Sequence, residues 1–138
     1  LKEEAARKRR QRGADITSIN PAMAFADSRL VSGESAMNLY LCLPFQQDSG
    51  GYEAATAPRT NLLFATWNSY PRTVGQLQAT LEGGAHGDVG PTLVLVRCGD
   101  QIFGGYASQR WSFEGRFHGT PKSFLFSITR DCKIPYHG

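Results

Sequence analysis

The sequence predicts one small α+β domain whose core is a mostly antiparallel β-sheet. Its 138 residues are 41% hydrophobic and 11% aromatic, which is enough for a single buried core. The 15 Gly and 7 Pro residues are scattered without a period, which indicates many turns between short elements. Several short runs rich in Leu, Val and Phe have the length and composition of buried strands, and the longest of them is far too short to span a bilayer.

The positive charge is concentrated at the N-terminus. Residues 1–12 contain six of the chain's 15 basic residues and two of its 12 acidic ones, so the rest of the chain is almost neutral. Ala, Glu, Lys, Arg and Gln favour a helix here, but with almost no apolar face, so we expect an exposed helix or charged linker that ends at Gly13. Residues 14–27 are typical of an extended linker. The near-neutral charge of the domain also argues against nucleic acid as a partner.

The middle of the chain predicts a helix, a loop and a strand. Residues 35–44 fit a short helix that ends at Pro44 and is capped by Ser32 or Ser35, although a strand would also fit this apolar run. Residues 45–59 are rich in Gly, Ser and Gln and indicate a long loop. The apolar run 61–67 then predicts a buried strand.

The second half of the chain predicts a further helix and three strands. A helix over 73–81 has Thr73 as its N-cap and places Val74, Leu77 and Leu81 at helical spacing. Runs 91–97 and 101–107 flank a tight turn and predict a β-hairpin, and a polar loop over 111–120 leads to a strand over 122–128. In the second hairpin strand, Gly104 and Gly105 indicate a bulge or a close approach of two backbones. Five aromatic residues alternate within these runs, and we expect them in the core rather than stacked on bases: Phe103, Tyr106, Trp111, Phe124 and Phe126.

In order and spacing, the elements from Leu39 onwards resemble the TLDc domain family. No single motif is diagnostic, but their succession over about two-thirds of the chain is fairly specific. The strand Trp and the His-Gly turn of the family pattern are replaced here, near Thr60 and at Tyr70-Pro71. The matching motifs are Leu43-Pro44, Leu62-Leu63-Phe64, Gly90-Pro91-Thr92-Leu93, Phe103-Gly104-Gly105-Tyr106, Trp111, Gly119 and Ser123-Phe124-Leu125-Phe126.

The resemblance implies a β-sandwich with flanking short helices, preceded by the extended or helical N-terminal segment. It divides the chain into a basic helix and linker, residues 1–27, and a TLDc-like domain, residues 28–138, without the C-terminal half of the family domain. It also implies a protein-interaction domain without a catalytic site, associated with oxidative-stress protection and with regulation of the vacuolar proton-pumping ATPase (V-ATPase). If the second half is absent, we expect apolar faces and sheet edges that a partner or further chain covers.

Residues that could carry chemistry favour structural interpretations. His86, His118 and His137 each precede a Gly and lack a second ligand at metal-binding spacing, so no metal or cofactor is expected. Asp100, Glu114 and His118 could form an acid–base pair, but carboxylates beside turn glycines more often cap or face water. The three cysteines, Cys42, Cys98 and Cys132, are widely spaced and indicate reduced thiols in a cytoplasmic protein.

The candidate partner-binding residues lie in the N-terminal segment. Its basic side chains could dock on an acidic protein surface such as tubulin, on anionic lipid or on nucleic acid, although a solvated helix is the simplest interpretation. Isolated apolar residues in the linker suggest anchors that order against a neighbour. They favour an alternative function, as a structural component of a ciliary or other microtubule-associated assembly with axonemal partners. The predicted residues are Arg7, Lys8, Arg9, Arg10, Arg12, Ile16, Ile19 and Phe25.

Overall fold

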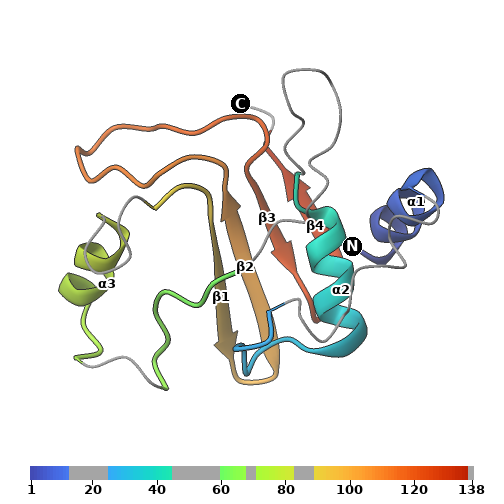
Figure 1. The fold of residues 1–138 in the computed structure, drawn as a ribbon, viewed down its shortest axis with the longest axis horizontal. Helices are drawn as coiled ribbons and strands as arrows, with labels where there is room; N and C mark the ends of the chain where they lie inside the picture. The colour runs from blue at the N-terminus through green and yellow to red at the C-terminus, as the bar shows by residue number, and fades with distance from the viewer. Residues whose placement is uncertain (13–24, 45–59, 68–70, 83–88, 137–138) are drawn as a thin grey trace.

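The computed structural model describes residues 1–12, 25–44, 60–67, 71–82 and 89–136, with the side chains of the first segment described as far as residue 8. Three short helices and four strands make up this part of the chain (Figure 1), which confirms the predicted α+β class. The strands form one antiparallel sheet in the order β1-β2-β3-β4. A second sheet layer, as in a sandwich, is not among the described residues. The elements are α1 (Lys2–Arg12), α2 (Gly33–Cys42), α3 (Val74–Leu81), β1 (Thr92–Cys98), β2 (Gln101–Ala107), β3 (Phe124–Ser127) and β4 (Cys132–Pro135).

The β1–β2 hairpin forms as the sequence predicts. A two-residue loop joins the strands, and Gly99 takes the positive φ of 61° that such a tight turn needs. In β2, Gly104 provides the expected close approach, because a Cβ atom there would lie 1.9 Å from the Val94 carbonyl oxygen and 2.9 Å from the Phe126 ring. The absence of a side chain at Gly104 therefore lets β1 and Phe126 pack against the backbone of β2.

A second hairpin, which the sequence interpretation missed in part, completes the sheet. The predicted strand over 122–128 is shorter, Phe124–Ser127, and its chain turns through Asp131 at a φ of 51°. β4 then pairs with β3, although the short stretch Cys132–Pro135 did not indicate a strand by itself.

Helix α2 covers one face of the sheet and forms the core (Figure 1). Leu39 and Cys42 of α2 pack with Phe124 and Phe126 of β3, and all four are buried. The helix ends close to where the sequence predicts, because Leu43 adopts an extended ψ of 143° before Pro44. Ser32 is its N-cap residue, although the Ser32 side chain makes no capping hydrogen bond.

Helix α1 is present, but it is not the solvated helix that its composition predicts. Ala5 is buried in a cluster with Met37 and Leu41 of α2, and Glu4 forms an ion pair with Lys133 of β4 at 2.9 Å. A helix with only one small apolar residue on a face can pack closely, because Ala allows the two helix backbones to approach. The division of the chain at residue 27 stays a prediction.

The predicted strand over 61–67 is wrong. Residues 60–65 have no regular secondary structure, and residues 66 and 67 form a turn. Leu62, Leu63 and Phe64 are only partly buried. The apolar composition predicted a buried strand, but a strand also needs a ladder of backbone hydrogen bonds, and none joins this segment to the described sheet.

Helix α3 forms where predicted, with a different buried face. Thr73 caps it by accepting a hydrogen bond from the Gln76 amide at 3.1 Å. Leu81 is buried and Leu77 partly so, whereas Val74 is 80% exposed, which contradicts the predicted three-residue apolar face. The C-terminal end is the anchored one, since Arg110 donates a hydrogen bond to the Glu82 carbonyl oxygen at 2.9 Å. The first turn thus projects into solvent.

Candidate protein-interaction surface

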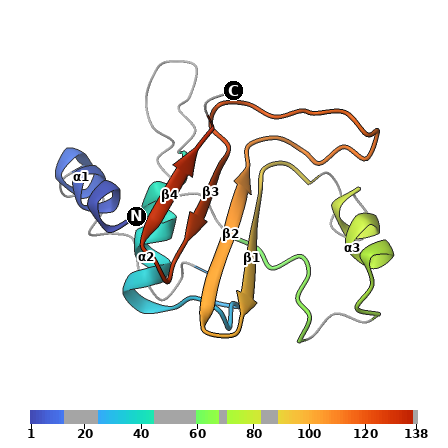
Figure 2. The same cartoon turned by 180° about the vertical axis from the view of Figure 1, so that it is seen from behind.

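The sheet has two apolar faces, and the described helices cover only one. Strand register places Val94, Gly105, Leu125 and Ile134 in one row across all four strands, on the side away from α2. Val96 and Phe103 form the adjacent row on the same side. Figure 2 shows this side of the sheet towards the viewer, with α2 behind it. We call Val94, Val96, Phe103, Leu125 and Ile134 the outer face.

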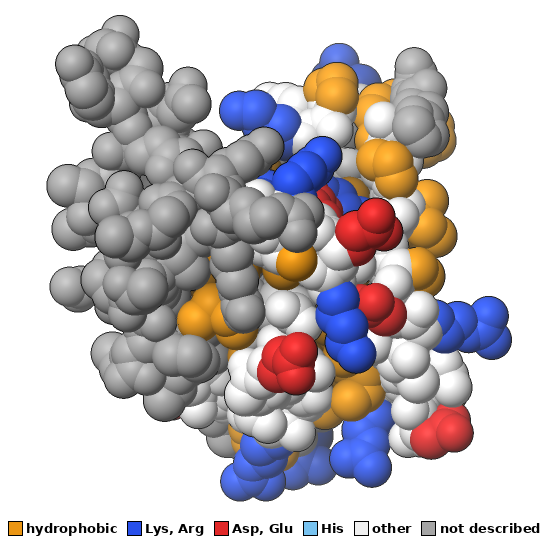
Figure 3. Space-filling model, turned by 90° about the vertical axis from the view of Figure 1, so that its right-hand side faces the viewer, with side chains coloured by type: hydrophobic (Ala, Val, Ile, Leu, Met, Phe, Trp, Pro, Cys, Tyr) orange, Lys and Arg blue, Asp and Glu red, His pale blue; other side chains and the backbone are white. Residues whose placement is uncertain are grey.

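The outer face is continuous and exposed. Its five side chains are between 40% and 60% exposed, the highest values being those of Leu125 and Ile134. The missing side chain of Gly105 does not break the row, because Leu125 leans over it with a methyl carbon 3.1 Å from where a Cβ would lie. In Figure 3, hydrophobic side chains follow the right-hand margin, the edge on which this face lies. A row of this kind marks an interaction surface more often than isolated exposed residues do.

The sequence interpretation placed all of these residues except Ile134 in strands, but it did not predict which side of the sheet would be exposed. Alternation shows that a strand has two faces, but two apolar faces give no signal of which one a helix covers. Phe103, predicted in the core, is therefore 41% exposed, whereas Phe124 and Phe126 are buried as expected.

The basic residues of the N-terminal segment are placed in part. Arg7 is largely exposed and lies 3.8 Å from a Glu4 oxygen. Lys8 is mostly buried, donates to the Leu43 carbonyl oxygen at 3.4 Å and lies 3.8 Å from Glu4. The side chains of Arg9, Arg10 and Arg12, and all of Ile16 and Ile19, fall outside the described residues.

Phe25 packs within its own chain, whereas the sequence interpretation offered it as an anchor for a partner. Its ring meets Tyr40 edge-on, with centroids 6.5 Å apart, and it packs against the core of α2 and β3. Its amide donates to the Thr60 hydroxyl at 3.2 Å, which fixes the chain at a φ of 56°. An intramolecular role thus explains this residue.

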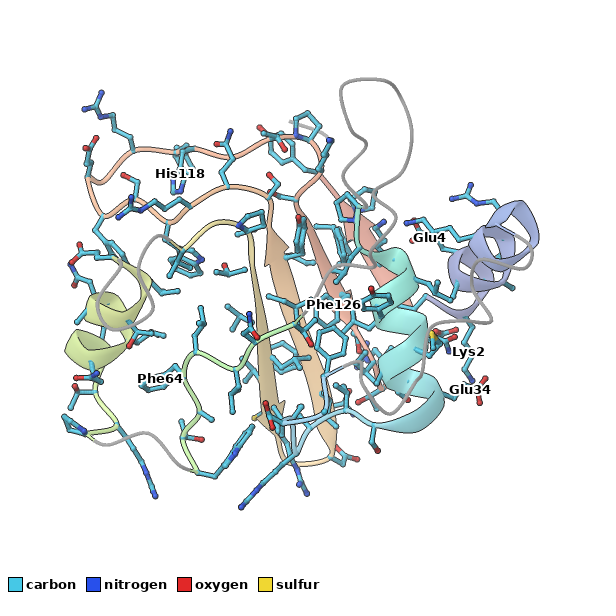
Figure 4. The ribbon with its side chains drawn as sticks, in the orientation of Figure 1. Lys2, Glu4, Glu34, Phe64, His118 and Phe126 are labelled. Carbon is cyan, nitrogen blue, oxygen red and sulfur yellow. The ribbon has the colours of Figure 1, made fainter. Side chains whose placement is uncertain are left out.

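The candidate acid–base residues do not come together. Figure 4 shows His118 in the loop between β2 and β3. His118 accepts a hydrogen bond from the Ser112 amide at 3.2 Å, and Glu114 pairs with Arg116 at 3.2 Å in the same loop. Asp100 lies in the β1–β2 turn, at the opposite end of β2 from this loop. These contacts stabilise the conformation of the loop, and none of them joins His118 to the carboxylate of Glu114 or Asp100.

The described residues contain no group of three His, Cys, Asp or Glu side chains that could hold a metal ion, and His86 and His137 lie outside them. Cys42, Cys98 and Cys132 are free thiols. Burial, together with the charge of Glu4, raises the pKa of Cys42 to about 11, so this thiol is not a nucleophile at neutral pH. Within the described ranges, none of the helices could cross a bilayer.

Comparison with known proteins identifies the family. The sequence profile described as the TLDc domain matches residues 24–138. A curated relative, the mTOR-associated protein MEAK7 of Xenopus laevis, is 46% identical over 43 residues, which is 30% of this chain and 9% of that protein. No solved structure matches. Because the profile covers most of the chain, including α2, α3 and the whole sheet, the chain belongs to the TLDc domain family.

Proposed function

We propose that this chain is a non-enzymatic protein-interaction domain and that the outer face is its main binding surface. The observation that carries the proposal is the exposure of five apolar side chains in a continuous patch across four strands. Water contact with such a patch is unfavourable, and a protein partner that covers it gains the corresponding free energy.

The free energy that a side chain gains on burial predicts a measurable contribution from individual residues of the outer face. Complete burial of a Leu or Ile side chain is worth about 1.5–3 kcal/mol. Leu125 and Ile134 are 60% and 58% exposed, so each has more than half of that burial still to gain. Each would then contribute roughly 1–2 kcal/mol, equivalent to roughly a 5- to 30-fold change in affinity.

As partner, we propose subunits of the V-ATPase, in a cytoplasmic role that includes protection against oxidative stress. Membership of the TLDc family supports this choice. The name of the frog relative, an mTOR-associated protein, makes association with mTOR a further proposal. The microtubule-associated alternative rested on isolated anchors, and the one described anchor, Phe25, is held by its own core. We therefore place that alternative second.

The test captures V-ATPase subunits from a cell lysate with the immobilised 138-residue chain. Leu125→Asn and Ile134→Asn should each reduce capture and together abolish it. Val74→Asn is the matched control, because it makes the same apolar-to-polar change at an exposed residue on α3. Circular dichroism should show that all variants remain folded, since exposed substitutions usually alter stability by about 0.5 kcal/mol or less. Undiminished capture by the double variant would exclude the outer face, and no capture by the unmodified chain would exclude the V-ATPase.

A further inference from the structure

A second surface lies at the end of the sheet where β3 begins and β4 ends, beside the C-terminal end of α2. There a groove of about 160 Å³ is bordered by Lys8, Lys122 and Lys133. Cys42 and Phe124 also line it, and its remaining contacts are Pro44, Pro121, Ser123 and Pro135. We call this site the lysine groove. It shares no residue with the outer face.

Among the described residues, the basic side chains around the lysine groove outnumber the acidic ones. Arg7, Lys8 and Lys133 all lie within 4 Å of the carboxylate of one residue, Glu4, which Figure 4 shows on the side of α1 that faces α2 and β4. Lys122 adds a further positive charge, and its ammonium group has no ion-pair partner among the described residues. This excess of positive charge among the described residues favours the binding of an anionic group at Lys122 and Lys133.

Two of the lysines are held in place before any ligand arrives. Lys133 donates to both oxygens of Glu4 at 2.9 and 3.0 Å, and its Nζ lies 4.3 Å from the centroid of the Phe124 ring. Lys8 donates to the Leu43 carbonyl oxygen at the end of α2. An ammonium group has three donors, so Lys133 keeps one for a further acceptor. Preorganised donors lose less conformational entropy when they bind.

We propose that the lysine groove binds a carboxylate-rich segment of a protein partner. This inference deepens the proposed function, on which it rests, by assigning the chemistry of a second contact. An Asp or Glu side chain could enter between Lys122 and Lys133 while the rings of Pro44, Pro121 and Pro135 contact the apolar parts of the same segment. Such a contact adds specificity and a faster association rate to the apolar outer face.

The recessed position of the lysines favours a peptide over a membrane or a nucleic acid. The side chains of Lys8 and Lys133 are only 20% and 23% exposed, so a flat lipid surface would not reach them. Binding to nucleic acid normally uses a basic stripe that follows several phosphates, whereas this groove is small and the sheet domain is almost neutral. An extended acidic segment fits both the size and the charge.

The experiment measures binding of a fluorescein-labelled peptide of alternating Glu and Ala to the 138-residue chain by fluorescence anisotropy. Lys122→Gln should weaken binding about 2- to 5-fold, the upper part of the range for one exposed charge pair. Lys133→Gln should weaken it roughly 10-fold, because this lysine is partly buried. Lys2→Gln is the matched control, since Lys2 is on α1 but does not line the groove. A peptide of alternating Gln and Ala should not bind.

Three results would overturn the inference. The first is absence of binding by the Glu-Ala peptide. The second is equal weakening by Lys2→Gln and Lys122→Gln, which would indicate diffuse charge attraction. The third is Lys122-dependent binding of phosphatidylserine vesicles, or of a single-stranded oligonucleotide, that is tighter than the binding of the Glu-Ala peptide. Leu125→Asn with Ile134→Asn should leave peptide binding unchanged, so failure of the outer face in the capture assay and failure of the groove are separate outcomes.

Discussion

Substitution of Gly104 by Ala tests the strand register on which both proposed surfaces depend. The new Cβ would lie 1.9 Å from the Val94 carbonyl oxygen, whereas real contacts of this kind are essentially never under 3.0 Å. The strands would have to separate by about 1 Å there, which lengthens the adjacent ladder hydrogen bonds beyond their normal range. The Phe126 ring, at 2.9 Å, would also have to move.

The expected loss of stability follows from these contacts. Two weakened ladder hydrogen bonds cost about 1 kcal/mol each, and displacement of a packed core ring adds about 1–3 kcal/mol. We therefore expect the free energy of unfolding to fall by roughly 3–5 kcal/mol, measured by urea denaturation followed by circular dichroism. Many small domains would not tolerate such a loss.

A second glycine provides the control. At Gly75, in the first turn of α3, a Cβ would meet only the Thr73 hydroxyl oxygen at 3.9 Å. Gly75→Ala should raise stability by about 0.5–1 kcal/mol, because Ala has less freedom to lose in a helix. If Gly104→Ala were as stable as the unmodified chain, β1 and β2 could not pair in the register described above.

Three further outcomes follow from single side chains. Burial opposes ionisation of Glu4, but the hydrogen bond and charge of Lys133 outweigh it and keep the pKa of Glu4 below its ordinary 4.5. The stability that this ion pair contributes should be complete above about pH 4.5 and should disappear as the pH falls through the lowered pKa. Urea titration at each pH should therefore show a smaller acid-induced loss of stability in Glu4→Gln than in the unmodified chain. Phe25→Ala should lower the free energy of unfolding by about 1–3 kcal/mol, because the ring packs on Tyr40 and the core; unchanged stability would favour the partner-anchor interpretation instead. A thiol reagent at neutral pH should label exposed Cys98 quickly and buried Cys42 only on unfolding, as counted by mass spectrometry, and equal rates would contradict the described core.

The sequence predicted best what local chemistry determines. The β1–β2 hairpin follows from two apolar runs around a Gly-containing turn, and α3 begins at Thr73 because its hydroxyl can satisfy a free helix amide. The end of α2 follows in the same way from Pro44. Each of these signals lies within a few residues of the feature it sets.

The features that depend on distant contacts were not predictable in this way. β4 is four residues long and exists because β3 provides its partner, whereas the more apolar segment 61–67 lacks a partner among the described strands and forms no strand. The packing of α1 depends on Ala5 meeting α2 and on Glu4 meeting Lys133, a residue 129 positions away. Composition alone describes such a helix as solvated.

The alternation of β3 and β4 connects the two proposed surfaces and also keeps them separable. Leu125 and Ile134 point to the outer face, while Phe124 and Lys133 point to the core side and border the lysine groove. Because adjacent residues of a strand face opposite ways, a substitution at 125 or 134 should alter one surface without changing the charge of the other. A change in the backbone register, as in Gly104→Ala, should instead damage both. A partner that covers the outer face and places an acidic segment in the groove should therefore lose affinity additively when variants of the outer face and of the lysine groove are combined. Gly104→Ala should weaken both contacts at once.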